Sequence, residues 1–210
     1  QLSNDVDPPI PGSTIQSRHH LGDLCLAGQI SSLCLKNCSL SRDSGDPCSS
    51  NGKHSVLSAM DILYLVQDCD TLIHLDLTGN GLQTGNFRHL MHLPVNLQSL
   101  SLSDNIVGTL LPLVCLLENS TKRNSLKSLN LSRNRISNKD LKELELLSTP
   151  LSFLDLSHNP FSTFKKIYEL VHLCPTLKWI RLKGHKIPPA KAEELRYLMQ
   201  EVDSCKLVVD

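Results

Sequence analysis

Three residues in the first half of the chain have the side-chain types of a hydrolytic active site. Ser99, His74 and Asp76 could act as a nucleophile, a general base and the carboxylate that orients the base. Asp76 and Asp155 are a second candidate, because paired carboxylates hydrolyse glycosidic bonds. Both mechanisms require side chains that meet in space, so the chemistry depends on the elements that carry these residues.

Motifs for metals and cofactors are weak in this sequence. His89 and His92 would share one face of a helix, but a zinc site needs three or four protein ligands. The eight cysteines include no Cys-x-x-Cys pair, and no glycine-rich phosphate loop occurs. We therefore expect no metal and no cofactor.

The strongest pattern is a sequence motif that occurs twice between residues 125 and 161. Leu-x-x-Leu-x-Leu-x-x-Asn ends at Asn134 and again at Asn159, and an apolar residue follows two places later. The second and third leucines alternate with polar residues, which predicts a short strand with one buried face. The Asn side chain suits a chain that turns out of a strand, because its amide can bond to backbone groups that have lost their ladder partners.

Six copies of this motif align by their first apolar residue. They begin at Ile30, Leu72, Leu97, Leu126, Leu151 and Leu177. The Asn position holds Cys38, Asn80, Asn105, Asn134, Asn159 and His185. Atypical residues at the two ends are what a solenoid with capping repeats predicts.

These copies resemble leucine-rich repeats, and the segments between them resemble the helix-bearing, ribonuclease-inhibitor-like branch. The resemblance implies an α/β solenoid, a curved horseshoe with a parallel β-sheet on its concave face and helices on its convex face. We expect helices at residues 56–67, 87–92, 110–118, 139–147 and 164–173. A further helix should run from Pro188 to about Val202, followed by a half-strand at 206–210.

The domain organisation follows from these segments. Residues 1–20 are rich in proline and polar residues and are expected to be a disordered lead-in or linker. Residues 21–210 form the repeat domain of about six repeats, with an insertion loop near 41–52 and a C-terminal cap at 188–210.

The expected sheet argues against both catalytic candidates. Residues that flank the strand leucines should form rows across the concave face, and Asp76 and Asp155 then lie three strands apart. At about 4.8 Å per strand the separation is roughly 14 Å, beyond the about 5–9.5 Å of a glycosidase pair. Ser99, His74 and Asp76 could meet on adjacent strands, but the surface is open and lacks a motif for an oxyanion hole. We therefore expect no enzyme and no small-molecule substrate.

A protein partner is the expected ligand, and its site is expected on the last repeats. The concave rows change there from small polar residues to aromatic and cationic ones. The predicted binding residues are Phe153, Trp179, Arg181 and Lys183, with Arg133 and His158 at the edge. Trp and Arg are the residue types that most often anchor interfaces. The alternative for Trp179, the only tryptophan, is packing against the C-terminal cap.

The charge distribution supports an acidic partner. Residues 1–120 have a net charge of −6, residues 121–191 of +9 and residues 192–210 of −3. This excess favours an acidic protein segment, with nucleic acid as the alternative. A solvated basic face without a partner would show the same composition.

Cysteine positions favour an intracellular protein, nuclear or cytoplasmic. Cys69 and Cys174 both stand three residues before the first leucine of a repeat, which suits small buried thiols. A secreted or cell-surface recognition domain is the alternative, because eight cysteines and sequons at Asn37, Asn119 and Asn130 are present. No apolar run reaches the roughly 20 residues that span a bilayer, so no membrane association is expected.

One junction suggests a narrower resemblance. Leu170-Val-His-Leu-Cys-Pro-Thr-Leu177, which leads into the strand at 177–182, is similar to the C-terminal repeats of tonsoku-like proteins. That resemblance implies a nuclear scaffold in replication-fork repair, a DNA repair role in which the repeat domain binds partner proteins.

Overall fold

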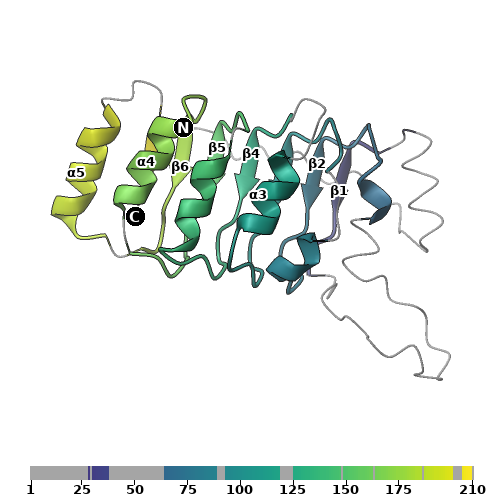
Figure 1. The fold of residues 1–210 in the computed structure, drawn as a ribbon, viewed down its shortest axis with the longest axis horizontal. Coiled ribbons are helices and arrows are strands. Elements are labelled where there is room, and N and C mark those ends of the chain that lie inside the picture. The colour runs from purple at the N-terminus through teal and green to yellow at the C-terminus, as the bar shows by residue number, and fades with distance from the viewer. Residues whose placement is uncertain are drawn as a thin grey trace.

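A computed structural model describes residues 28, 30–37, 64–88, 93–118, 125–147, 149–162, 164–185, 187–200 and 205–209. One sheet of seven parallel strands forms the body of these residues, with each strand beside the next one in the sequence (Figure 1). The strands are β1 (Ser32–Cys34), β2 (His74–Asp76), β3 (Ser99–Ser101), β4 (Ser128–Asn130), β5 (Phe153–Asp155), β6 (Trp179–Arg181) and β7 (Lys206–Val208). The predicted α/β solenoid and its terminal half-strand are confirmed.

The register of the sheet places equivalent repeat positions opposite one another. One row is Ser32, His74, Ser99, Ser128, Phe153, Trp179 and Lys206. A second row is Cys34, Asp76, Ser101, Asn130, Asp155, Arg181 and Val208. The residue between the two rows is buried in β1 to β6, as strand alternation requires. The predicted alignment of equivalent positions in rows is confirmed for these two rows, and β7 extends each by one member.

The helical segments lie on one face of the sheet (Figure 1). They are η1 (Thr84–Phe87), α3 (Leu111–Glu118), η2 (Asp140–Leu146), α4 (Lys165–Leu173) and α5 (Pro189–Gln200), where η denotes a 3₁₀ helix. We call the opposite side of the sheet the open face. It corresponds to the concave face expected from the sequence.

Three of the five expected helices lie in the described residues as expected, with one change of type. The segments expected at 110–118 and 164–173 are α3 and α4, but that at 139–147 is the 3₁₀ helix η2. The two 25-residue repeats carry 3₁₀ helices, whereas the repeats of 29 and 26 residues carry α3 and α4. A 3₁₀ helix rises about 2.0 Å per residue against about 1.5 Å for an α-helix, so a shorter segment spans the same distance.

Two expected helices and several other predicted segments fall partly or wholly outside the described residues. Of the helix expected at 87–92, only residues 87 and 88 are described, and η1 ends at Phe87. Of the helix expected at 56–67, only residues 64–66 are described as helical. The lead-in at 1–20, the insertion near 41–52, Cys38, and His89 and His92 lie outside the described residues. Among the described residues, no helix is long and apolar enough to cross a membrane.

Stacked leucines and a ladder of asparagines hold the repeats together. Leu129, Leu131 and their equivalents in and just after β2 to β6 are almost completely buried. Each buried Asn bonds across two repeats: Asn105 accepts hydrogen bonds from the backbone N–H groups of Asn80 and Leu82, at 3.0 and 2.9 Å. Its amide donates to the carbonyl oxygens of Leu77, Leu102 and Ser103. This confirms the expected role of the repeated Asn.

His185 continues the ladder at the last repeat. The amide of Asn159 donates to the Leu131 carbonyl oxygen at 2.9 Å. One repeat later, His185 Nε2 lies 3.0 Å from the Leu156 carbonyl oxygen, the equivalent acceptor. The imidazole also stacks on Phe161, with ring centroids 4.1 Å apart. An aromatic ring thus replaces the amide where the stack ends.

Candidate protein-binding surface

Phe153 and Trp179 lie side by side at the C-terminal end of the open face. They are register partners on β5 and β6, and both side chains are half-buried. The Lys206 ammonium lies 4.9 Å from the centroid of the Trp179 ring, and the Arg181 guanidinium lies 5.4 Å from that of Phe153. Both distances fall within the range of cation–π attraction. Trp179 therefore fits both alternatives in part. The terminal strand covers part of the ring, as in packing against the cap, and the rest of the ring stays accessible to a partner.

Arg181 has a structural partner besides Phe153. Its Nη1 lies 3.4 Å from Oδ2 of Asp155, a carboxylate that is only 7% exposed. Asp155 Oδ1 also accepts a hydrogen bond from the backbone N–H of Ser157 at 2.9 Å. Asp155 is thus a buried group that supports the strand end, and Arg181 compensates its charge.

Lys183 is an accessible cation of the predicted site. Its side chain is exposed and makes no ion pair with any described residue. Its backbone N–H donates to the Ser157 hydroxyl at 3.0 Å, which fixes the chain just after β6. Ser103, Ser132 and Ser157 of the same row are buried, so this row presents its lysine but not its serines.

Arg133 and His158, which the sequence placed at the edge of the site, lie in the turns after β4 and β5 and share an unusual backbone conformation. Both are exposed, and their φ angles are 54° and 57°. In every repeat the residue before the Asn position has the left-handed backbone conformation, with a positive φ angle. The other members of this row are Asn37, Gly79, Asp104 and Gly184. At Gly184 a Cβ atom would lie 2.1 Å from His158 Nδ1, so glycine is required there for both conformation and space.

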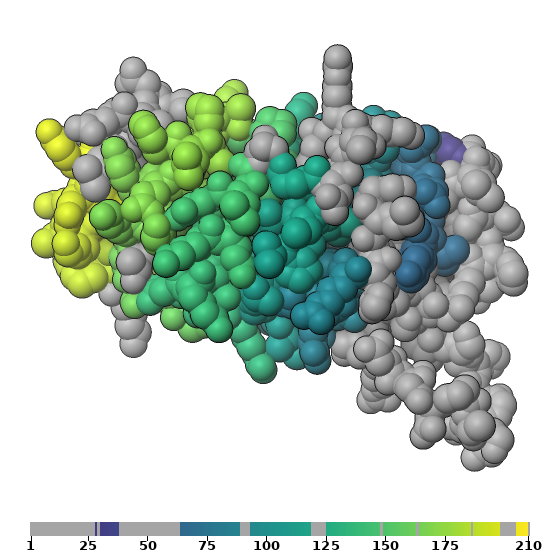
Figure 2. Space-filling model, viewed as in Figure 1, coloured from purple at the N-terminus to yellow at the C-terminus, as the bar shows by residue number. Residues whose placement is uncertain are grey.

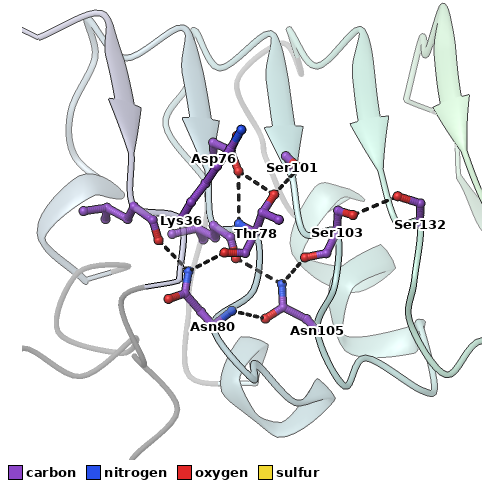
Figure 3. A network of polar contacts seen from close by, with 10 residues as sticks. Lys36, Asp76, Thr78, Asn80, Ser101, Ser103, Asn105 and Ser132 are labelled. Carbon is purple, nitrogen blue, oxygen red and sulfur yellow. Dashed lines mark hydrogen bonds and ion pairs between the residues drawn. The ribbon is translucent and has the colours of Figure 1, made fainter. Parts of the chain in front are cut away.

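The open face of the first repeats is occupied by its own hydrogen bonds (Figure 3). Asp76 accepts bonds from the backbone N–H and the hydroxyl of Thr78, at 3.0 and 2.6 Å, and pairs with Lys36 at 3.1 Å. The Thr78 and Ser101 hydroxyls are 2.9 Å apart. The hydrogen bond with Asp76 is the main cause that raises the pKa of Lys36. Polar groups that satisfy one another offer less to a ligand than the cations around β6.

Neither hydrolytic candidate is assembled. His74 and Ser99 are register partners, but no hydrogen bond links His74 to Ser99 or Asp76 in this described region, and the Asp76 carboxylate points to Thr78 and Lys36 (Figure 3). Asp76 and Asp155 stand on β2 and β5, three strands apart as expected.

Two of the described thiols have pKa values shifted away from activation. Burial raises the pKa of Cys205 to about 11 and, together with the charge of Glu118, raises the pKa of Cys174. Such thiols stay protonated near neutral pH, whereas nucleophilic cysteines have lowered pKa values. Cys69 and Cys174 are buried, as predicted, and Cys34, Cys115, Cys174 and Cys205 form no disulfide.

Comparison with known proteins agrees with the Leu and Asn register. Residues 123–144, which include β4 and its Asn134, match the family model described as "Leucine Rich repeat". The chain thus has the fold of a leucine-rich-repeat solenoid, and one of its repeats matches that family model. Domains of this kind are protein-binding modules, and no curated protein sequence matches the chain.

Solved structures match the leucine-rich-repeat chain as well. One of them is the crystal structure of a TLR13-ssRNA13 complex, with 16% sequence identity and a TM-score of 0.46. That match covers 92% of this chain and 30% of the other, so this chain spans under a third of the length of the one it matches.

Sequence reasoning missed one residue of the binding surface. Lys206 lies beside Trp179 because β7 pairs with β6 in the same register as the other strands. Aligning Lys206-Leu-Val with Trp179-Ile-Arg would have revealed it, since both sequences place an apolar residue between two outward positions.

Proposed function

We propose that this leucine-rich-repeat protein is a non-catalytic scaffold that binds an acidic segment of a partner protein on the C-terminal part of its open face. The observation that carries the proposal is the cluster of Phe153, Trp179, Arg181, Lys183 and Lys206. Half-buried aromatic rings supply apolar contact area at low entropic cost, and the cations beside them attract carboxylates.

The contrast between the two ends of the open face supports the location. Around β2 and β3 the side chains pair with one another, so a ligand would have to break existing hydrogen bonds. Around β6, Lys183 and Lys206 make no ion pair in the part of the chain that the structure describes. A partner carboxylate can therefore bind there without displacing an internal anion.

Trp179 supplies a direct test, because it is the only tryptophan of the chain and lies within the proposed site. Proteins that bind the immobilised chain but not its Lys183→Glu variant would be identified from a nuclear extract. An acidic segment of such a partner should then change the emission of Trp179 on titration. Lys142→Glu, on the exposed surface of η2, is the matched control and should retain every partner. Equal retention by all three chains would contradict the proposal.

We also propose a cellular location and a cellular role from the sequence. Free thiols would support an intracellular location. The replication-fork role that the tonsoku-like resemblance implies requires that location. Titration of the denatured, unreduced protein should find eight thiols. Paired cysteines would favour the secreted recognition domain instead.

A further inference from the structure

The helical face holds a groove between the last two helices. The N-terminal halves of α4 and α5 line a groove of about 600 Å³. These helices are neighbours at the C-terminal end of the molecule (Figures 1 and 2). Its walls include Tyr168 of α4 and Leu195 of α5, together with Phe164 and Pro188, the residues just before the two helices. This volume lies within the range of about 300–1,000 Å³ that is typical of binding pockets.

The buried face of α5 includes a short side chain, whereas α3 and η2 bury leucines three residues apart. Ala192 is the buried residue of α5 one turn before Leu195. By contrast, the space lined by Leu93, Leu116 and Leu126 beside α3 measures only about 10 Å³. The apolar side chains of α4 therefore keep accessible surface on the side of α5.

Charges at the groove favour a negative occupant. Lys165, the first residue of α4, lines it and makes no ion pair in the described part of the chain. Lys191 pairs with Glu194 at 2.6 Å, but both side chains are more than half exposed, at 64% and 55%. Exposed pairs of this kind are weak and exchange readily. An incoming carboxylate can thus bind Lys165 and compete for Lys191.

The dimensions favour a helical segment. Pro188 and Leu195 are seven residues apart, which is about 10 Å along a helix. Apolar residues at positions i and i+4 of a helix lie about 5–6 Å apart, so two of them fit along the groove. Amphipathic helices dock in grooves through such pairs.

We propose that the α4–α5 groove is a second docking site, and that its occupant is an amphipathic helix of a protein partner whose apolar stripe is flanked by acidic residues. The site is on the face of the sheet opposite Trp179, so it does not depend on the open-face function. A scaffold with both sites can hold two acidic segments at once.

The test uses fluorescein-labelled synthetic helices and the full chain. The probe carries Leu and Phe at i and i+4 with Glu beside them; a matched probe carries Lys in place of Glu. Fluorescence anisotropy should show binding of the acidic probe and at least about tenfold weaker binding of the basic one. Emission of Trp179 should stay unchanged, which distinguishes this groove from the open face.

Two variants locate the binding. Lys165→Glu should weaken binding of the acidic probe by about tenfold or more. Folding should be kept, because an acidic residue at the start of α4 is favourable for the helix. Ser162→Phe should block the groove from its exposed rim, and Lys142→Glu should bind normally. Absence of binding, equal binding of the two probes, or equal loss in Lys165→Glu and Lys142→Glu would overturn the proposal. If the chain forms a dimer and Ser162→Phe makes it monomeric, the occupant is a second copy of the chain. That result would overturn the proposal of a partner helix.

Discussion

At the scale of single residues, the open face separates groups that build the solenoid from groups left for a ligand. Asp155 and Asn130 belong to the concave rows by sequence, yet both accept the backbone N–H two residues later and so complete the strand ends. Within the described part of the chain, the side-chain ends of Trp179 and Lys183 make no comparable hydrogen bond. Position in a repeat therefore does not by itself define a binding residue.

Trp179→Ala is expected to weaken binding of the acidic partner about thirtyfold, because truncating an interface anchor commonly costs about 2 kcal/mol. Isothermal titration with the identified segment measures the effect. Ser101→Ala, in the self-bonded part of the open face, is the control and should bind normally. A Trp179→Ala chain that melts normally and binds with unchanged affinity would exclude the ring from the site.

Asn105→Ala is expected to destabilise the fold by about 3 kcal/mol or more, because it leaves several buried backbone N–H and C=O groups without partners. The bonds that are lost join two adjacent repeats, at Asn80, Leu82 and Leu77. Urea unfolding followed by circular dichroism measures the change. Asn96→Ala, which removes one exposed bond to the Asp70 carbonyl oxygen, should cost much less.

At the scale of elements, neighbouring repeats supply one another's helix caps. The Glu143 carboxylate, from η2, accepts hydrogen bonds from the Thr109 hydroxyl and from the backbone N–H groups of Leu110 and Leu111. These groups stand at the start of α3, where N–H groups lack partners within the helix and a negative charge is favourable. The helical face is thus stabilised between repeats as well as within them.

Glu143→Ala should therefore destabilise the chain by about 1–2 kcal/mol, although the residue lies outside α3. Hydrogen exchange should show the largest loss of protection at the first turn of α3. Glu193→Ala on the exposed surface of α5 should change stability by less than about 0.5 kcal/mol. Loss of protection confined to η2 would show that the carboxylate does not cap α3.

At the scale of the whole molecule, neutrality conceals an uneven distribution of charge. The net charge of +9 over residues 121–191 coincides with the repeats whose open face carries unpaired cations. Arg181 is unsuitable for testing this field, because Arg181→Glu would place a second negative charge beside buried Asp155. Lys183 lacks that complication.

Lys183→Glu is expected to slow association with the acidic partner about three- to tenfold at low salt, because long-range attraction steers encounters. The difference from the unchanged chain should shrink near 0.5 M salt, where the Debye length is only a few ångströms. Stopped-flow recording of Trp179 emission measures both rates. A defect that persists at high salt would show a short-range contact instead of steering.

The spacing of Leu and Asn was sufficient to predict the repeats, the strand register and the rows that contain Phe153, Trp179, Arg181 and Lys183. Alternation fixes which face a strand residue occupies, and stacking of similar repeats aligns equivalent positions. Those inferences need only short-range periodicity. The predicted insertion and lead-in are not tested by the described residues.

Contacts between repeats were decided only by the tertiary structure. They include Lys206 over Trp179, Arg181 beside buried Asp155, and His158 against Gly184. The groove between α4 and α5 belongs to the same class. Each depends on the sizes and directions of side chains about 25 residues apart, which local periodicity does not encode.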